Sequence, residues 1–180
     1  MRLDHVCVAV RSLERACRLF VDLMGGEFVG GGDNPRLGVR AVQLRYPPGV
    51  KIELLQPLTS DNWLSRYLDR HGEGLHHLTI VAPDIPEAEQ RLHQFGFETV
   101  DTDISHPTWQ ETFTRPSSTF GALIQVAKPS HPWEKAPPGL MLDDVLAGRV
   151  QVLDNIMTWK DSGQPVKELP HDRRRRQQNP

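Results

Sequence analysis

The chain contains an internal repeat, which restricts its possible folds more than any other feature of the sequence. The segment "LDHVCVAVRSLERA" at residues 3–16 aligns with "LHHLTIVAPDIPEA" at residues 75–88. The same offset of 72 residues aligns "IELLQP" at residues 52–57 with "IQVAKP" at residues 124–129. Because segments far apart within one copy keep a single offset, we expect two copies of one structural unit that pack as a pair.

The predicted elements follow the same order in both copies: a strand, a helix and three further strands. In the first copy the pattern predicts strands over residues 3–10, 27–31, 38–46 and 50–57, and a helix that begins after Ser12 and ends at Gly25–Gly26. In the second copy it predicts strands over residues 75–82, 97–104, 109–115 and 121–128, and a helix over 84–95. The predicted fold class is α+β, with two βαβββ modules in a pseudo-twofold arrangement.

The remaining segments divide the chain into five parts. We expect the first module over residues 1–58, a connecting helix within 59–74 and the second module over 75–129. The segment "LMLDDVLAGRVQVL" has helical spacing of its apolar residues, so residues 130–160 are predicted as a helical C-terminal extension that packs on the sheet by default. Residues 161–180, which contain four consecutive arginines, are predicted as a disordered tail.

Composition excludes several classes of function. The 180 residues carry a net charge of −2, which gives no general attraction for nucleic acid. No apolar stretch approaches the ~20 residues that span a bilayer, and the N-terminus lacks the pattern of a signal peptide. With two cysteines in apolar-patterned positions, a disulfide framework is not expected. These features predict a cytoplasmic protein that contacts neither nucleic acid nor membrane.

Four residues at matched positions of the repeat are candidate metal ligands: His5, Glu53, His77 and Gln125. Pseudo-twofold packing would bring their strands together around one cavity. Imidazole nitrogen with carboxylate or amide oxygen suits Zn, Co, Ni, Mn or Fe. Side chains alternate along a strand, so only one of the adjacent pair His76 and His77 should face inward; the repeat selects His77 and leaves His76 on the other face.

Each candidate ligand also has a structural interpretation. A single histidine on a strand is more often a hydrogen-bonded polar residue than a ligand. A buried, hydrogen-bonded Gln125 is nearly as well supported as a coordinating one, because amides are poor ligands. Glu53 favours the metal interpretation, since an inward carboxylate without a cation would be costly to bury.

Four segments resemble the vicinal oxygen chelate superfamily: "LDHVCVAVRSLERA", "VKIELLQPL", "GEGLHHLTIVAPDIPEAE" and "RPSSTFGALIQVAKP". The resemblance covers residues 3–129 and is greatest to the methylmalonyl-CoA epimerase pattern, followed by bacterial glyoxalase I. It implies the glyoxalase/bleomycin resistance fold, one divalent metal ion per site, and chemistry through a metal-bound enolate or enediolate. His5, Glu53 and His77 match ligand positions of the family, and the fourth ligand position, a carboxylate in epimerases, falls on Gln125.

This departure raises the question of which group moves a proton. Abstraction next to a carbonyl needs a base, and neither Gln125 nor Ala41, where some epimerases place an additional carboxylate, can act as one. Glu111, on the strand expected beside that of Gln125, is the candidate catalytic base, and metal-bound hydroxide is an alternative to it. A solvent-facing or salt-bridged strand carboxylate is the structural interpretation of Glu111. His106 is a second candidate, and Gln43, His106 and Phe113 are expected to contact the substrate.

The leading functional interpretation is a divalent-metal-dependent isomerase or epimerase of the methylmalonyl-CoA epimerase type, acting on an acyl-CoA thioester or a similar small carbonyl substrate. A glyoxalase-type lyase is one alternative, because it uses the same electronic principle. A non-haem Fe(II) oxygenase is another, since two His and one Glu form its ligand set. The third is a non-catalytic small-molecule binding or resistance protein. Modules of this superfamily sometimes pair between chains, so a homodimer is expected.

Overall fold

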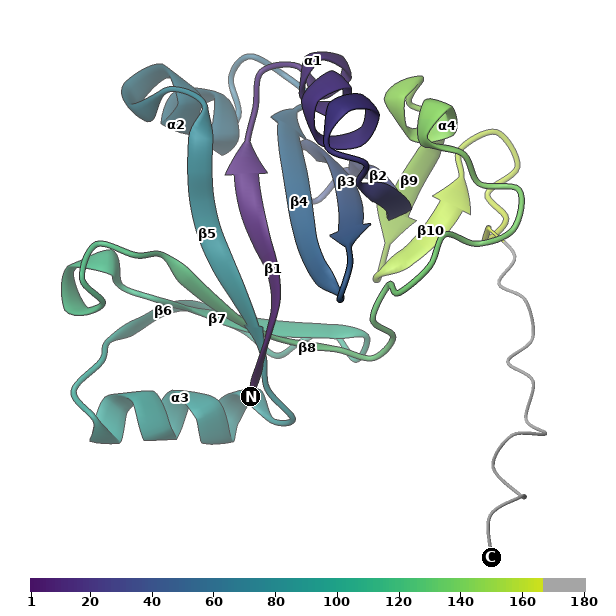
Figure 1. Cartoon of the computed structure of the whole chain (residues 1–180). Helices are drawn as coiled ribbons and strands as arrows, with labels where there is room; N and C mark the ends of the chain where they lie inside the picture. The colour runs from purple at the N-terminus through teal and green to yellow at the C-terminus, as the bar shows by residue number, and fades with distance from the viewer. Residues whose placement is uncertain (167–180) are drawn as a thin grey trace, which may run out of the picture.

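A single mixed sheet joins both modules in the computed structural model, which describes residues 1–166 (Figure 1). The strands of the first module are β1 (Arg2–Ala9), β2 (Glu27–Asn34), β3 (Val39–Tyr46) and β4 (Val50–Pro57). Those of the second are β5 (Gly74–Val81), β6 (Thr99–Asp103), β7 (Trp109–Thr114) and β8 (Ile124–Pro129). Their order, β2-β3-β4-β1-β5-β8-β7-β6, is mirrored about its centre, which confirms the α+β fold with paired βαβββ modules.

The helices of the two modules begin where the sequence predicts, after Ser12 and after Asp84, and the connecting helix begins after Asn62. Ser12 accepts a hydrogen bond from the Arg15 amide at the start of α1 (Leu13–Cys17), which continues as a π-helix, η1 (Arg18–Leu23). Asn62 caps α2 (Trp63–His71) and Asp84 caps α3 (Ile85–Gln94). A 3₁₀ turn, η2 (Pro116–Ser118), follows β7. Figure 1 shows α1 and α3, the corresponding helices of the two copies, on opposite sides of the molecule.

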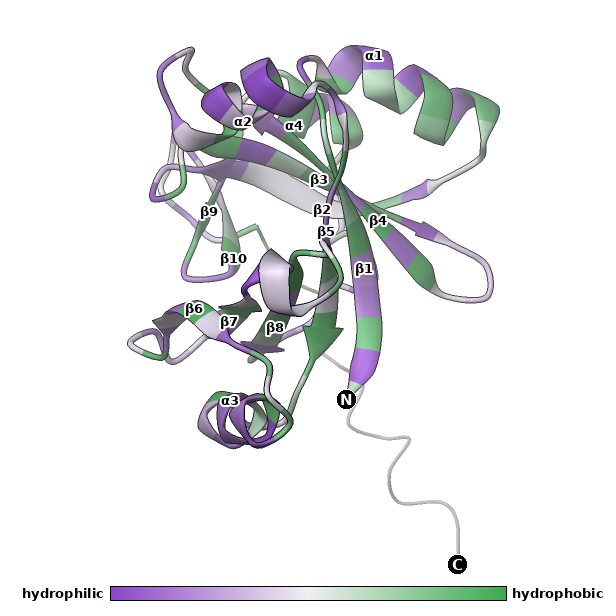
Figure 2. Ribbon diagram, turned by 90° about the vertical axis from the view of Figure 1, so that its left-hand side faces the viewer, coloured by the Kyte–Doolittle hydropathy of each residue, from purple (hydrophilic) through white to green (hydrophobic). Residues whose placement is uncertain are grey.

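Apolar and polar side chains alternate along the strands, so that one face of the sheet packs in the core and the other lines a cavity. On β3, Val42 and Leu44 are fully buried in the main core beneath α1, whereas Gln43 between them lines a cavity. On β4, Leu54 faces the same core and Glu53 the same cavity. Green and purple bands alternate along β4 in Figure 2. This period of two is what places polar side chains together on one face.

The C-terminal extension is not mainly helical, so the prediction for residues 130–160 was wrong in part. Only α4 (Leu142–Leu146) forms a helix, and it is followed by β9 (Val150–Leu153) and β10 (Ile156–Trp159). Gly148 ends the helix with φ of 71°. Asp154 and Asn155, with φ of 49° and 62°, form the two-residue turn of a hairpin. The β-branched residues before this turn belong to a strand, although their spacing also fits a helix.

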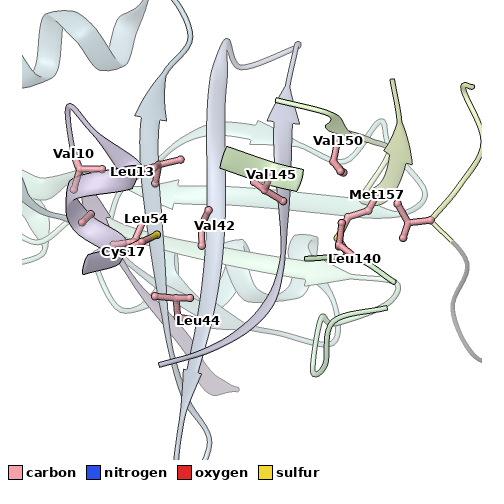
Figure 3. Packing of buried hydrophobic residues seen from close by; sticks show 12 residues of the cluster. Val10, Leu13, Cys17, Val42, Leu44, Leu54, Leu140, Val145, Val150 and Met157 are labelled. Carbon is pink, nitrogen blue, oxygen red and sulfur yellow. The ribbon is translucent and has the colours of Figure 1, made fainter. Parts of the chain in front are cut away.

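The hairpin β9–β10 extends the sheet of the first module beyond β2. Its docking depends on the glycine run of β2, because a Cβ at Gly30 would lie 3.0 Å from Trp133 and 3.2 Å from Met157. Val145 of α4, Val150 and Met157 enter the core of the first module (Figure 3). The extension therefore packs on the sheet, as expected, and also completes its edge.

Residues 161–166 belong to the folded structure, contrary to the prediction of a disordered tail from residue 161. Val166 is buried and its amide donates to the carbonyl of Met157 at 2.8 Å. Pro165 forms a bridge with Thr158 on the free side of β10. The four arginines lie outside the described residues. Within residues 1–166, no helix is long and apolar enough to cross a membrane.

A buried carboxylate fastens the extension to the first module. Asp33 of β2 is 7% exposed and accepts from the guanidinium of Arg40 at 2.5 Å and from the ammonium of Lys160 at 2.5 Å. Arg40 also donates to the carbonyl of Leu146, the last residue of α4. Burial alone would raise the pKa of Asp33, but the hydrogen bonds from Arg40 and Lys160 lower it.

We expect Asp33→Asn to reduce the free energy of unfolding by roughly 2 kcal/mol, because it removes charge-assisted hydrogen bonds from a buried carboxylate. Thermal unfolding should show a decrease in Tm of roughly 4 to 8 °C for a chain of this size. Since the folded pKa is lowered, this contribution is present above the unfolded pKa of about 3.9 and is lost as the pH falls through the folded value. The difference between wild type and variant should therefore shrink in acid.

Glu27→Gln is the matched control, because it breaks an ion pair of the same sheet that is exposed to solvent, Glu27–Arg45 at 3.1 Å. Such pairs contribute at most about 1 kcal/mol. Equal losses in both variants would contradict the anchoring role of Asp33.

Candidate metal centre and its cavity

A cavity of about 830 Å³ lies between the two modules, and the extension supplies part of its wall. The first module contributes Gln43 and Glu53, and the second contributes His77 and Glu111. From the extension, Trp133 and the turn at Asp154–Asn155 line the cavity. The volume falls in the range of small-molecule binding sites.

Three predicted ligands converge at this cavity from neighbouring strands. His5 on β1, Glu53 on β4 and His77 on β5 each offer a donor atom within 4.8 Å of the other two. The Nε2 atom of His5 lies 3.6 Å from Oε2 of Glu53. Because β1 pairs with both β4 and β5, the sheet itself brings the three side chains together.

An unpartnered atom supports a cation at this point. Nε2 of His77 is buried and has no hydrogen-bond partner among the described residues. Leaving a buried polar atom without a partner costs about 1 to 3 kcal/mol, and a divalent ion would remove this cost. Two imidazole nitrogens and one carboxylate form a three-residue set that leaves coordination positions free for ligands from the cavity. The residues present therefore fit a divalent transition metal or zinc.

Cys7 and His76 form a second possible cluster with His77, whose donor atoms also lie within 4.8 Å of one another. Burial and the nearby charge of Glu53 raise the pKa of the Cys7 thiol. Since the thiolate is the form that binds metals, this cluster is the weaker candidate.

The charges around His5 set its protonation. Burial alone would lower its pKa, but the charge of Glu53 and the hydrogen bond to Asp4 raise it to about 9. Burial would raise the pKa of Glu53, but the charge of His5 lowers it to about 2. His77 differs, because burial outweighs the charge of Glu53 and lowers its pKa to about 4. Without a bound cation, His5 is therefore charged and His77 neutral at pH 7.

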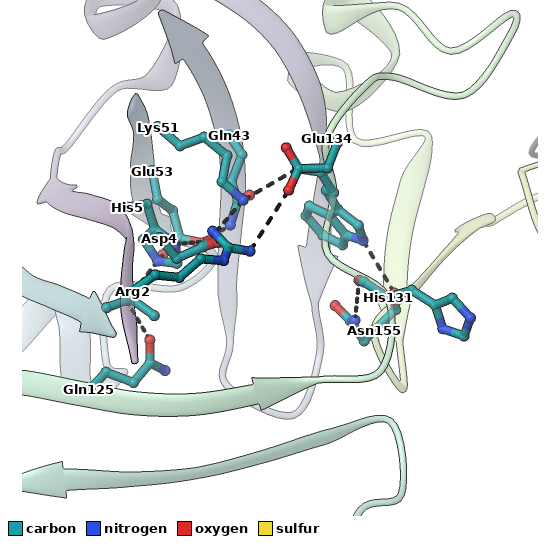
Figure 4. A network of polar contacts seen from close by, with 12 residues as sticks. Arg2, Asp4, His5, Gln43, Lys51, Glu53, Gln125, His131, Glu134 and Asn155 are labelled. Carbon is teal, nitrogen blue, oxygen red and sulfur yellow. Dashed lines mark hydrogen bonds and ion pairs between the residues drawn. The ribbon is translucent and has the colours of Figure 1, made fainter. Parts of the chain in front are cut away.

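A buried ion pair holds His5 from the side opposite to Glu53 (Figure 4). Nδ1 of His5 lies 2.9 Å from Oδ2 of Asp4, and Lys51 approaches the same oxygen at 2.8 Å. Arg2 binds the other oxygen of Asp4 at 3.0 Å. Burial would raise the pKa of Asp4, but the hydrogen bonds and charges of His5 and Lys51 lower it. Sequence reasoning missed Asp4 and Lys51, although Lys51 stands two residues before Glu53 and so shares its face.

Gln125, the fourth predicted ligand, lies beside the cluster with both ends of its amide in hydrogen bonds. Its Oε1 accepts from the hydroxyl of Thr79 at 2.6 Å, and that hydroxyl lies 2.8 Å from Nε2 of His5. Its Nε2 donates to Glu111 at 2.6 Å. Coordination by Gln125 stays a prediction.

Glu111 points into the cavity from β7. One carboxylate oxygen, Oε2, accepts from the amide of Gln125 and from the indole N–H of Trp109 at 2.8 Å. The other, Oε1, lies 3.7 Å from the guanidinium of Arg36. Two hydrogen-bond donors thus occupy Oε2 and leave Oε1 the less occupied oxygen.

The three residues expected to contact substrate all line the cavity. Gln43 donates to Oε1 of Glu53 at 3.1 Å, so it also fixes that carboxylate. The ring of Phe113 lies 6.3 Å from that of His77, edge to face. His106 lies 3.5 Å from Asp154 of the β9–β10 turn. Their contact with a substrate stays a prediction.

The prediction that His76 faces away from His77 was wrong. Nδ1 of His76 lies 2.8 Å from Nδ1 of His77, and His76 also lines the cavity. The reason is a β-bulge in β5 at this point, which interrupts the alternation of side chains.

Comparison with known proteins gives one family. The sequence profile of the Glyoxalase/Bleomycin resistance protein/Dioxygenase superfamily matches residues 4–113. The ethylmalonyl-CoA/methylmalonyl-CoA epimerase of Cereibacter sphaeroides is 34% identical over 129 residues, which cover 69% of this chain and 96% of that protein. The mitochondrial methylmalonyl-CoA epimerase of Mus musculus is 35% identical over 69% of this chain and 71% of its own length. The crystal structure of methylmalonyl-CoA epimerase from Mycobacterium tuberculosis superimposes with a TM-score of 0.64 at 27% identity, over 72% of this chain and 88% of that one.

We expect binding of Co²⁺ at pH 7.5 to release about one proton per chain, because the cation has to displace the proton of His5, whose pKa is raised to about 9. Between pH 6.5 and 8.5 the affinity should rise about tenfold per pH unit. Titration calorimetry in buffers of different ionisation enthalpy measures the number of protons.

His77→Ala provides the comparison, since the pKa of His77 is lowered to about 4 and this ligand carries no proton at pH 7.5. This variant should bind Co²⁺ more weakly and still release about one proton. Binding of Co²⁺ to the wild type without proton release would contradict the charged state of His5.

Proposed function

The chain belongs to the glyoxalase/bleomycin resistance protein/dioxygenase superfamily, and from this premise we propose that it is a divalent-metal-dependent epimerase of the methylmalonyl-CoA epimerase type. Its substrate would be an acyl-CoA thioester or a related carbonyl compound with an acidic proton on the neighbouring carbon. Two curated relatives that cover 69% of the chain carry this activity in their names.

The observation that carries the proposal is a carboxylate that lines the same cavity as a candidate cation-binding cluster. His5, Glu53 and His77 form the cluster, and Glu111 faces the same cavity from the second module. Gln125 connects the cluster with Glu111. Its amide oxygen accepts from Thr79, which contacts His5, and its amide nitrogen donates to Glu111. Glu111 thus stands next to the position where the family pattern has a carboxylate and this chain has glutamine.

A divalent ion bound by the cluster would act as a Lewis acid that stabilises negative charge on a carbonyl oxygen of the substrate. Glu111 would accept the proton from the neighbouring carbon on Oε1, the oxygen without a close hydrogen bond. Return of the proton to the same face would give exchange without inversion, and inversion requires that the planar intermediate present its other face to Oε1 before the proton returns. Trp109 and Gln125 hold Oε2, so the carboxylate keeps one orientation while the proton moves. The guanidinium of Arg36 lies 3.7 Å from Oε1.

The cavity wall would restrict water around the reacting carbon. Phe113 packs beside His77 from the second module. Trp133 of the extension covers Gly30 of β2 from the other side, and its indole N–H donates to the carbonyl of Asn155 at 3.3 Å. Apolar groups of this kind strengthen the electrostatic interactions that stabilise developing charge.

Glu111→Gln should reduce exchange of the α-proton of methylmalonyl-CoA or ethylmalonyl-CoA with deuterated water by roughly 100- to 10,000-fold, the contribution of a positioned general base. Mass spectrometry or NMR of the thioester in D₂O measures this rate. Binding of Co²⁺ should persist in the variant, since Glu111 is not among the three clustered ligands.

Glu98→Gln is the control, because Glu98 is an exposed carboxylate of the same module that pairs with Arg115. It should leave the rate unchanged. Undiminished exchange in Glu111→Gln would exclude Glu111 as the base, and a loss in His106→Asn instead would assign that role to His106. No exchange by the wild type, together with conversion of a glutathione hemithioacetal or with oxygen uptake in the presence of Fe²⁺, would replace the epimerase by a lyase or an oxygenase.

A further inference from the structure

The two central strands each contain one additional residue, and both additional residues directly precede a ligand histidine. In the ladder between β1 and β5, the pair Leu3–Ile80 is followed by His5–Thr79, so Asp4 has no counterpart on β5. Further along, the pair Cys7–His77 is followed by Val8–Leu75, so His76 has no counterpart on β1. Asp4 and His76 are also equivalent in the internal repeat.

A β-bulge changes the direction of the side chains around it. In a regular strand, neighbouring side chains point to opposite faces, and neither Asp4 nor His76 could reach the histidine that follows it. Here both do. Oδ2 of Asp4 lies 2.9 Å from Nδ1 of His5, and Nδ1 of His76 lies 2.8 Å from Nδ1 of His77.

We propose that Asp4 and His76 are positioning residues, which the two bulges turn toward the ligand histidines so that each accepts the Nδ1–H of its neighbour and directs its Nε2 to the metal. The inference rests on the metal site of the proposed function, and does not depend on the reaction that the site performs.

The unpartnered Nε2 of His77 supports this direction of the hydrogen bond. If His76 donated to His77 instead, the proton of His77 would reside on Nε2, as a buried donor without a partner. With His77 as the donor, Nε2 presents a lone pair to Glu53 and His5, which is the arrangement that a cation requires.

The environment of His76 is built to hold its ring in place. Its ring lies 5.5 Å from that of Trp63 and 4.5 Å from that of Tyr67, both on α2. Tyr67 donates to the carbonyl of Leu75 and Trp63 donates to that of Leu37. Trp63 and Tyr67 therefore hold the ring of His76 in place. In the first module, Lys51 and Arg2 hold the carboxylate of Asp4 in the same way.

His76→Phe tests the proposal, because it keeps a ring against Trp63 and Tyr67 and removes only the acceptor. We expect Co²⁺ affinity, measured by competition with a chromophoric chelator, to fall about 10- to 100-fold, the usual effect of removing such a partner. His76→Asn, whose Oδ1 takes the place of Nδ1, should restore most of the affinity. In metal-free protein at pH 8, long-range ¹H–¹⁵N spectra should show His77 protonated on Nδ1 in the wild type and a mixture of tautomers in His76→Phe.

His71→Phe is the matched control, because His71 packs on the same Tyr67 ring at 4.8 Å but lies away from the ligands. It should bind Co²⁺ as the wild type does. For the first module, Asp4→Leu combined with Lys51→Met removes the acceptor without leaving a buried cation unpaired. This double variant should lose affinity by a similar factor.

Wild-type affinity in His76→Phe, or a His77 tautomer that does not change, would overturn the proposal for His76. Wild-type affinity in the double variant would overturn it for Asp4. A wild type that binds Co²⁺ and depends on both residues, but exchanges no α-proton, would overturn the epimerase and leave the positioning roles intact. A wild type that binds no Co²⁺ would overturn the metal site and with it this inference.

Discussion

The antiparallel pairing of β1 with β5 is the constraint on which the rest of the structure depends. It joins the two modules into one sheet, and each of these strands has the last strand of its own module on its other side. Residues that are 24 to 72 positions apart in the chain, such as His5, Glu53 and His77, thereby become neighbours. A shift of this pairing by one residue would turn the side chains of a strand to the other face, so the two bulges also fix which groups reach the cavity.

Burial of so many charged groups is tolerated because their charges balance. In the absence of a cation, Asp4 and Glu53 are matched by Lys51 and by protonated His5. Replacing one proton by a divalent ion adds a single positive charge to this buried cluster. An anionic ligand would then be favoured in the cavity, because opposite charges attract strongly where water is excluded. The positive charge that a divalent ion adds to the cluster would thus also stabilise the negative charge of the proposed enolate.

The repeat and the alternation of apolar residues were sufficient to predict the paired modules, and the common offset identified the three clustering residues. The prediction failed where a local rule was broken. His76 was placed on the wrong face, because no sequence pattern marked the bulge. The hairpin β9–β10 was missed, because the helical spacing between Leu140 and Leu146 was the only pattern used for residues 130–160. The partners of the ligands depend on register between strands, as for Lys51 with Asp4. Trp109 was missed as well, although it lies two residues before Glu111 and so shares its face.

The bridge between Thr158 and Pro165 has a consequence for assembly. Sheets can grow between molecules when an edge strand exposes unpaired N–H and C=O groups. Here β9 pairs with β2 at Asp33–Gln151, and the new border is β10, with only four residues. On its free side lies a proline, which has no N–H to offer a further strand. Two copies of this chain that associate on this side would have to meet through side chains on their faces, since the backbone there is closed to strand addition.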